Sequence, residues 1–174
     1  NPDGYDFTIS TLGEPSNLSP VKGRDFVTLE DRIAFSSQIK NIFNQIQNAR
    51  TFPSFEKAGP REKIFHSAGN TCVAIVTCGG LCPGLNNVIK GLVNVLESNY
   101  GIHNVLGIRY GFKGLIKNSA HAPISLNKKT VDEIHKEGGT ILGSSRGSQD
   151  PVEMVNQLIN LNIDILFTIG GDGT

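Results

Sequence analysis

The chain has 174 residues, of which 38% are hydrophobic, so it is long enough to bury one core in about one domain. Its 16 basic and 16 acidic residues balance, and no dense Lys/Arg run occurs, which argues against nucleic acid and anionic membranes as partners. No apolar run approaches the roughly 20 residues that cross a bilayer, and no secretory leader is visible. We therefore expect a soluble, cytoplasmic protein with no membrane partner.

The chain starts at Asn1 without an initiator Met and stops at Thr174, directly after a strand pattern. We therefore expect it to be a piece of a larger protein. Its three cysteines, Cys72, Cys78 and Cys82, lie close together without C-x-x-C spacing. This pattern favours reduced thiols over a metal site or a redox pair.

Residues 1–71 form an expected N-terminal extension. Glycine and proline interrupt residues 1–27, which predicts an extended arm. Thr28 can cap a helix, and isoleucines then recur at near-helical spacing, which predicts a helix over residues 28–49. Residues 51–71 read as a surface connector.

Residues 72–174 alternate between strand and helix patterns and form an expected nucleotide-binding α/β domain, incomplete at its GGDGT end. The expected strands are residues 73–77, 105–109 and 165–169. The expected helices start at Asn86 or Asn87, at Thr130 with a capping box over residues 131–137, and at Asp150 followed by Pro151. Apolar stripes are expected at Val88, Leu92, Val95 and Leu96 and at Val152, Val155, Leu158 and Ile159. The pattern predicts a three-layer, mostly parallel Rossmann-like sheet.

Ligands bind such a sheet beyond the carboxyl ends of its strands. The first loop there, GGLCPG from Gly79, matches neither G-x-G-x-x-G nor G-x-x-x-x-G-K-[ST]. Its glycines would let backbone N–H groups approach phosphate oxygens, although an ordinary strand-to-helix turn explains them equally well.

The last loop places Asp172 between glycines, where a carboxylate can hold magnesium, and Gly173 leaves space for a nucleotide. A plain turn is the alternative. Arg146, among glycine and serine in GSSRGSQD, suits a phosphate, although a solvated surface charge is the commoner role of such an arginine.

Four stretches occur in unbroken order: VAIVTCGGLCPGLNNVIKG, GIRYGFKGL, GGTILGSSRGSQDP and ILFTIGGDGT. Together they closely resemble the N-terminal part of 6-phosphofructokinase, and AGPREKIF just upstream resembles the plant-type and trypanosomatid-type ATP-dependent branch. The resemblance covers about Ala58 to Thr174 and implies the phosphofructokinase fold.

The resemblance also implies a site for ATP phosphates and Mg²⁺. Asp172 matches the family's magnesium-binding aspartate, and Gly173 stands where pyrophosphate-dependent relatives typically have another aspartate, which favours ATP. Arg146 would offset charge on the transferring phosphoryl group. The implied nucleotide-binding residues are Gly79, Gly80, Arg146, Gly147, Gly171, Asp172, Gly173 and Thr174.

The implied reaction is phosphorylation of fructose 6-phosphate by Mg-ATP to fructose 1,6-bisphosphate. The family's catalytic aspartate lies in a T-I-D-N-D-like stretch that this chain lacks, so we expect the chain alone to be inactive. The resemblance further implies an allosteric homo-oligomer, a tetramer, with a glycosome-like organelle as an alternative location. Competing interpretations are a pyrophosphate-dependent relative, an NAD or lipid kinase with GGDGT, and a regulatory or assembly segment.

Overall fold

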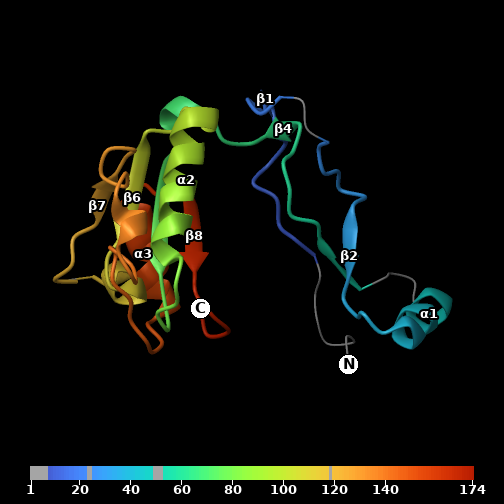
Figure 1. Ribbon diagram of the computed structural model, residues 1–174. Coiled ribbons are helices and arrows are strands. Elements are labelled where there is room, and N and C mark those ends of the chain that lie inside the picture. Colours follow the sequence, from blue (N-terminus) through green and yellow to red (C-terminus); the bar gives the residue numbers. More distant parts are fainter. Residues whose placement is uncertain (1–7, 23–24, 49–52, 118) are drawn as a thin grey trace. The chain divides into compact units, whose positions relative to one another are not determined.

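The computed structural model describes residues 8–22, 25–48, 53–117 and 119–174 (Figure 1). It divides the chain into two compact units, one on each side of the Phe65–His66 bond. No helix in these described ranges is long and apolar enough to cross a membrane.

The first unit consists of two short antiparallel ladders and one helix. Strand β1 (Asn17–Leu18) pairs with β4 (Lys63–Ile64), and β2 (Arg32–Ala34) pairs with β3 (Ser54–Glu56). Helix α1 spans Ile39–Asn48. The expected arm and connector therefore supply the strands β1, β3 and β4, which the sequence pattern did not reveal.

The predicted helix over residues 28–49 is wrong in its first part. The Asp31 carboxylate accepts hydrogen bonds from the Thr28 N–H (2.8 Å) and from the Thr28 hydroxyl (3.1 Å). In a capping box the Thr28 hydroxyl would also accept a bond from the Asp31 N–H, but that N–H donates to the Thr28 carbonyl at 3.3 Å instead. Thr28 and Asp31 thus close a turn, and the same hydrogen bonds lower the pKa of Asp31.

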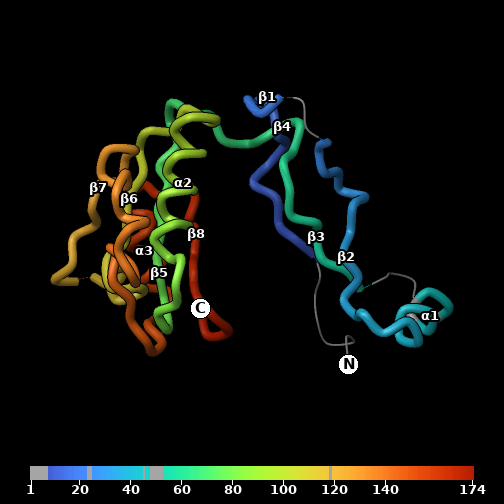
Figure 2. The backbone as a smooth tube through the Cα atoms, viewed as in Figure 1, coloured from blue at the N-terminus to red at the C-terminus, as the bar shows by residue number. Residues whose placement is uncertain are grey.

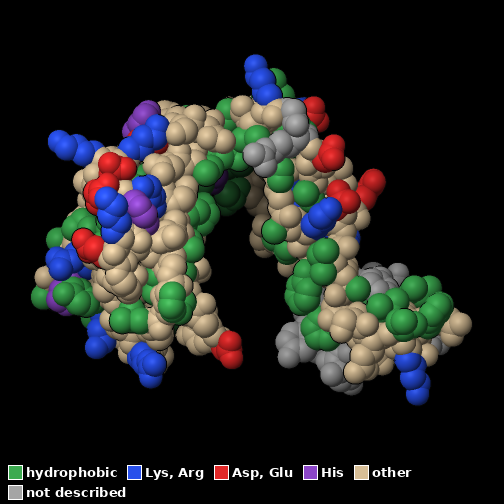
Figure 3. Space-filling model, viewed as in Figure 1, with side chains coloured by type: hydrophobic (Ala, Val, Ile, Leu, Met, Phe, Trp, Pro, Cys, Tyr) green, Lys and Arg blue, Asp and Glu red, His purple; other side chains and the backbone are tan. Residues whose placement is uncertain are grey.

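Helix α1 carries an apolar face that the described part of the first unit leaves exposed. Ile39, Phe43 and Ile46 are 70%, 60% and 63% exposed. Their spacing of four and three residues places them on one side of the helix. The space-filling view shows hydrophobic side chains gathered over this helix (Figure 3).

The second unit is built on a four-stranded sheet in the order β7-β6-β5-β8. The central strand β5 (Cys72–Thr77) is parallel to both β6 (Asn104–Ile108) and β8 (Ile165–Ile169). Strand β7 (Ile124–Leu126) runs antiparallel along β6. The mostly parallel sheet is confirmed, and the antiparallel edge strand is an addition.

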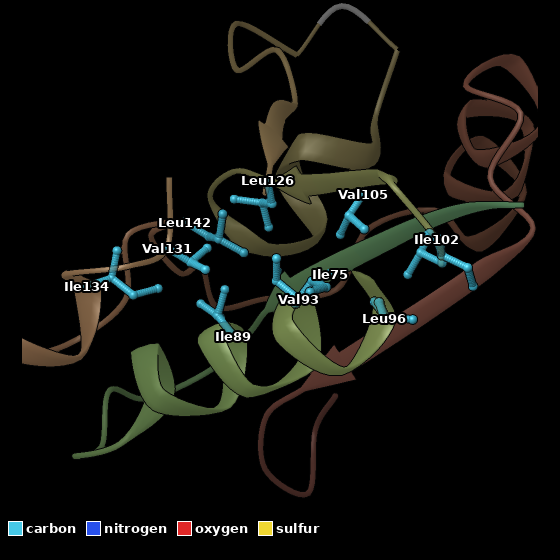
Figure 4. Close-up of a cluster of buried hydrophobic side chains, with 11 residues drawn as sticks. Ile75, Ile89, Val93, Leu96, Ile102, Val105, Leu126, Val131, Ile134 and Leu142 are labelled. Carbon is cyan, nitrogen blue, oxygen red and sulfur yellow. The ribbon is translucent and has the colours of Figure 1, made fainter. Parts of the chain in front are cut away.

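Helices cover both faces of the sheet and complete three layers. Alternate residues of β5 point to opposite faces, and all six residues of the strand are buried. Val73 and Ile75 face helix α2 (Leu85–Tyr100), where Ile89, Val93 and Leu96 meet them (Figure 4). Ala74 and Val76 face the other way, where Met154 and Leu158 of α3 (Pro151–Asn160) pack. The described part of this unit also has three short 3₁₀ helices: η2 (Ala68–Asn70), η3 (Gly111–Leu115) and η4 (Ile134–Lys136).

The buried stripes of the two α-helices differ from those predicted. In α2, Leu92 and Leu96 pack in the core as predicted, but Val88 and Val95 are about half exposed, and Ile89 and Val93 are fully buried in their place. In α3, Leu158 packs on the sheet as predicted, but the other predicted members Val152, Val155 and Ile159 are exposed, and Met154 and Leu161 pack there in their place. Both helices have apolar residues on adjoining sides, so spacing alone did not decide which side faces the sheet.

Two predicted helix starts are also corrected. Helix α2 begins at Leu85 after Gly84, so Asn86 and Asn87 lie inside its first turn. The predicted helix over residues 131–137 reduces to η4, because the Thr130 N–H and hydroxyl bond to Asn127 and form a turn. The third predicted start is confirmed: the Asp150 carboxylate accepts a bond from the Val152 N–H at 2.9 Å.

Candidate functional site

Three segments meet at the carboxyl end of the parallel strands, where the sequence places its glycine loops. These segments follow β5, η4 and β8, and they lie at the same end of the sheet in Figure 2. The Cys78 N–H donates to the Ile169 carbonyl at 2.8 Å, which joins the first segment to the last. A Cβ added at Gly79 would lie 4.0 Å from the Gly171 N atom, so these two loops are neighbours.

The segment after η4, residues 137–146, is called the wall segment below because most of it borders a cavity. It is tied to Gly79 by a pair of hydrogen bonds. The Gly79 N–H donates to the Ser145 carbonyl at 3.0 Å, and the Ser144 hydroxyl donates to the Gly79 carbonyl at 2.7 Å. Gly79 has a φ of +77°, a left-handed conformation that glycine adopts without strain. In this conformation the Gly79 N–H can bond to Ser145 while the Gly79 carbonyl bonds to Ser144.

A cavity of about 480 Å³ opens between the β5–α2 loop and the wall segment. Arg146 is the only charged residue among those that line it, and a Cβ added at Gly80 would lie 3.4 Å from the Arg146 Nη2 atom. Arg146 thus stands directly across from the glycine pair. The lining residues are Gly79, Gly80, Leu81, Gly138, Gly139, Thr140, Gly143, Ser144, Ser145 and Arg146.

This arrangement is suited to an anion with several oxygens. Glycine lets such a ligand approach the backbone, where N–H groups can donate to it, because no side chain intervenes. Arg146 adds a permanently charged planar donor that can bond two oxygens of one phosphate. The lining has no carboxylate or imidazole that would repel an anion or take a proton from a substrate.

The remaining predicted site residues lie beside the cavity but do not line it. They are Gly147, Gly171, Asp172, Gly173 and Thr174. The turn after β8 folds back on itself: the Thr174 N–H donates to the Gly171 carbonyl at 3.0 Å, and a Cβ at Gly170 would collide with the Thr174 side chain. Asp172 is exposed, and a Cβ at Gly173 would meet no heavy atom within 4 Å. The structure therefore brings together Gly79, Gly80 and Arg146, with the last loop adjacent.

The cysteines near the first loop take no part in the cavity. All three are free, and Cys82 alone is exposed. Burial raises the pKa of the Cys78 thiol, against a smaller opposing effect of a hydrogen bond from the Phe112 backbone. Burial, together with the Asp164 carboxylate, also raises the pKa of Cys72. Both buried thiols therefore stay protonated at neutral pH, which makes them poor nucleophiles.

Two buried polar residues that the sequence prediction missed bind the wall segment. Thr77, at the end of β5, donates its hydroxyl to the Gly143 carbonyl at 2.7 Å, and Asn86 of α2 accepts a bond from the Ile141 N–H at 2.9 Å. Both are 1% exposed. Asn86 occupies the buried stripe that Ile89 and Val93 continue, so a polar residue in an apolar stripe was the available signal.

The wall segment also rests on strand β6 and the residues after it. Buried Leu142 lies over Gly107, where an added Cβ would collide with the Leu142 side chain. The Tyr110 N–H donates to the Leu142 carbonyl at 2.7 Å, and the Tyr110 ring covers Gly143. Tyr110 has a φ of +57°, which is uncommon for a residue other than glycine. Such a conformation persists only where the surrounding contacts hold it.

Comparisons with known proteins show the family of this chain. The family described as Phosphofructokinase matches residues 72–174. The ATP-dependent 6-phosphofructokinase of Borreliella burgdorferi is 43% identical over 178 residues, which cover 99% of this chain and 39% of that protein. The enzyme of the same name from Trypanosoma cruzi is 50% identical over 119 residues, covering 68% of this chain and 24% of that protein.

A crystal structure of Pichia pastoris phosphofructokinase in the T-state is 24% identical, covers 71% of this chain and 13% of that chain, and has a TM-score of 0.48. The chain thus spans less than half the length of these relatives. The family match covers more than half of the chain and includes every strand and helix around the cavity. The chain belongs to the phosphofructokinase family.

Proposed function

We propose that the protein to which this chain belongs transfers the γ-phosphoryl group of ATP to fructose 6-phosphate, and that the cavity holds ATP phosphates. The observation that carries the proposal is the placement of Arg146 across the cavity from Gly79 and Gly80. Supporting it, the curated relatives of this chain are named ATP-dependent 6-phosphofructokinases.

In this proposal the chain contributes positioning and charge neutralisation. Gly79 and Gly80 bring backbone close to the donor phosphates, and Gly147 extends that contact beside Arg146. Gly171 to Thr174 form the neighbouring turn against the same phosphates. The guanidinium of Arg146 offsets the charge that spreads over the transferring group, which is the main task of a protein in phosphoryl transfer.

The proposed Mg²⁺ site uses Asp172. Within the described ranges, no three His, Cys, Asp or Glu side chains gather into a group that could hold a metal ion. We therefore propose a site in which the chain supplies only part of the Mg²⁺ coordination. Asp172 is a single exposed carboxylate beside the phosphate loops. That donor set fits Mg²⁺, which is commonly held by one or two carboxylates together with substrate phosphates. Bound there, Mg²⁺ would neutralise phosphate charge.

The proton of the sugar hydroxyl needs a base that the cavity lining does not supply. The acceptor site and this base therefore belong, in our proposal, to parts of the protein outside this chain. The chain alone is proposed to be inactive. We further propose that the full-length protein is a cytoplasmic, allosteric enzyme. The family resemblance implies that it is a homo-oligomer, a tetramer.

The test uses the full-length protein with Mg²⁺. We expect it to form fructose 1,6-bisphosphate from fructose 6-phosphate and ATP, measured by a coupled assay. Pyrophosphate should replace ATP poorly, and NAD and diacylglycerol should not accept phosphate. Phosphorylation of NAD or a lipid in place of the sugar phosphate would overturn the proposal. Activity of the isolated 174-residue chain would refute the part that concerns the missing base.

A further inference from the structure

The wall segment supplies seven of the ten residues that line the cavity, yet the structure gives it no helix or strand. Its backbone therefore lacks the repeating hydrogen bonds that fix regular structure. What holds the segment in place is a small set of bonds from neighbouring elements. Two of the side chains in this set are buried and lie outside the lining: Thr77 and Asn86.

The Asn86 carboxamide uses both of its ends on the wall segment. Its Nδ2 donates to the Glu137 carbonyl at 3.1 Å, and its Oδ1 accepts from the Ile141 N–H at 2.9 Å. These two backbone groups lie on either side of the lining residues 138–140. One rigid side chain thus fixes the width of that short span from the first turn of α2.

The Thr77 hydroxyl binds the next part of the segment. It donates to the Gly143 carbonyl at 2.7 Å and lies 3.0 Å from the Thr140 hydroxyl, which accepts from the Leu142 N–H at 3.1 Å. Since a hydroxyl has one proton to donate, the consistent arrangement has Thr140 donating to Thr77. The resulting chain of bonds runs from Leu142 through both threonines to Gly143 and leaves each hydroxyl proton bonded.

We propose that Thr77 and Asn86 are positioning residues of the nucleotide site: together they clamp the wall segment so that Arg146 stays opposite Gly79 and Gly80. The inference rests on the proposed function, because the clamp affects turnover only if the cavity holds the phosphate donor. A clamp differs from a general contribution to stability, since it acts on the geometry at Arg146. Misplacing a reacting group by about 1 Å can lower a rate by roughly 100-fold.

Thr77 offers a test with a matched control in the full-length protein. Thr77→Val removes the hydroxyl with little change of shape, and Thr77→Ser keeps it. Thr71→Val is the control, because Thr71 is also buried, 4% exposed, and donates its hydroxyl to the Ser67 carbonyl at 2.6 Å just before the opposite end of β5. Kinetics with ATP and fructose 6-phosphate are compared with melting temperature for each variant.

We expect Thr77→Val to lower kcat/KM for ATP by roughly 10- to 100-fold, whereas Thr77→Ser stays within about 3-fold of the unmodified protein. Thr71→Val should lower the melting temperature to a similar degree but change kcat/KM less than about 3-fold. If the two valine variants lose activity and melting temperature in parallel, the Thr77 hydroxyl is merely structural and the proposal is wrong.

Hydrogen exchange provides a second readout that does not depend on catalysis. In Asn86→Ala, the Ile141 amide should exchange faster than in the unmodified protein, while amides of β5 such as Ile75 keep their protection. Unchanged exchange at Ile141 would overturn the clamp itself. The unmodified protein could prove inactive toward fructose 6-phosphate while the Ile141 amide of Asn86→Ala still exchanges faster. That result would refute the proposed function and leave the clamp standing.

Discussion

Arg146 faces the glycine pair from an exposed position, and its value for the site comes from that placement rather than from burial. Its fork of donors is accessible to an incoming anion. A charge arranged in advance stabilises a transition state without needing to be reorganised during the reaction. The effect of removing Arg146 should therefore be larger on the chemical step than on binding.

We expect Arg146→Ala in the full-length protein to lower kcat by on the order of 100-fold and to weaken ATP binding much less. Arg146→Lys should recover part of kcat, because it restores the charge without the planar fork. Steady-state kinetics and ATP titration measure the two effects. Equal losses in kcat and affinity would show that Arg146 only binds the ground state.

Gly173 is the residue that the sequence associates with donor choice. A Cβ there would meet no heavy atom within 4 Å, so Gly173→Asp should leave the packing of the chain unchanged. Its carboxylate would, however, lie beside the proposed ATP phosphates and repel them. We expect KM for ATP to rise at least about 10-fold and the use of pyrophosphate relative to ATP to increase.

Gly173→Ala is the control for this substitution, since it adds volume without charge. A large loss of ATP use in Gly173→Ala would assign the effect to sterics instead. Unaltered ATP kinetics in Gly173→Asp would contradict the predicted role of Gly173 altogether.

Helix α3 shows which features of an element its own sequence determines. Asp150 and Pro151 set its start correctly, because a cap acts within a few residues. Of its predicted buried side only Leu158 packs on the sheet, because that side depends on how the helix lies on β5 and β8. The Thr28 and Thr130 starts failed for a related reason: each threonine bonds within a turn of its own. Short polar side chains support turns and caps alike.

Asp150→Ala should lower the free energy of unfolding by about 1 kcal/mol, because the Val152 N–H loses its acceptor at the start of α3. Asp150→Asn should cost much less, since asparagine caps about as well. Urea unfolding followed by circular dichroism measures both. Equal loss in the two variants would mean that the charge of Asp150, rather than its cap, stabilises the helix.

Across the chain, the sequence predicted the sheet of the second unit, whose strand and helix patterns repeat. It missed the short ladders of the first unit, whose paired strands are far apart in sequence. Strands β5, β6 and β8 are continuous apolar runs, and their parallel pairing follows from the intervening helices. The ladders β1–β4 and β2–β3 consist of two or three residues each and join segments far apart in sequence. Thr77 and Asn86 were missed because their roles depend on partners more than fifty residues away.

The division into units leads to a prediction about truncation. The two core clusters of the second unit consist of residues between Val73 and Ile169, with no member from the first unit. Removing residues 1–65 from the full-length protein should therefore leave the cavity intact, with ATP affinity within about 3-fold of the original. Isothermal titration and a circular dichroism spectrum measure this.

The cut belongs after Phe65 because a cut at Thr51 would leave β3 and β4 without the strands that pair with them. A control that ends the deletion at residue 51 should therefore be less soluble, since unpaired strands tend to associate. Loss of ATP binding in the deletion of residues 1–65 would show that the second unit needs the first.

Gly107 lies inside β6 and does not line the cavity, yet the Leu142 side chain occupies the place where its Cβ would be. A single methyl group at this position would displace the Leu142 side chain, and Leu142 belongs to the wall segment that borders the cavity. The packing of the hydrophobic core thus helps to set the shape of the cavity. We therefore expect substitutions inside the sheet to change the shape of the cavity, and with it the proposed choice of phosphoryl donor, without altering any residue that lines the cavity.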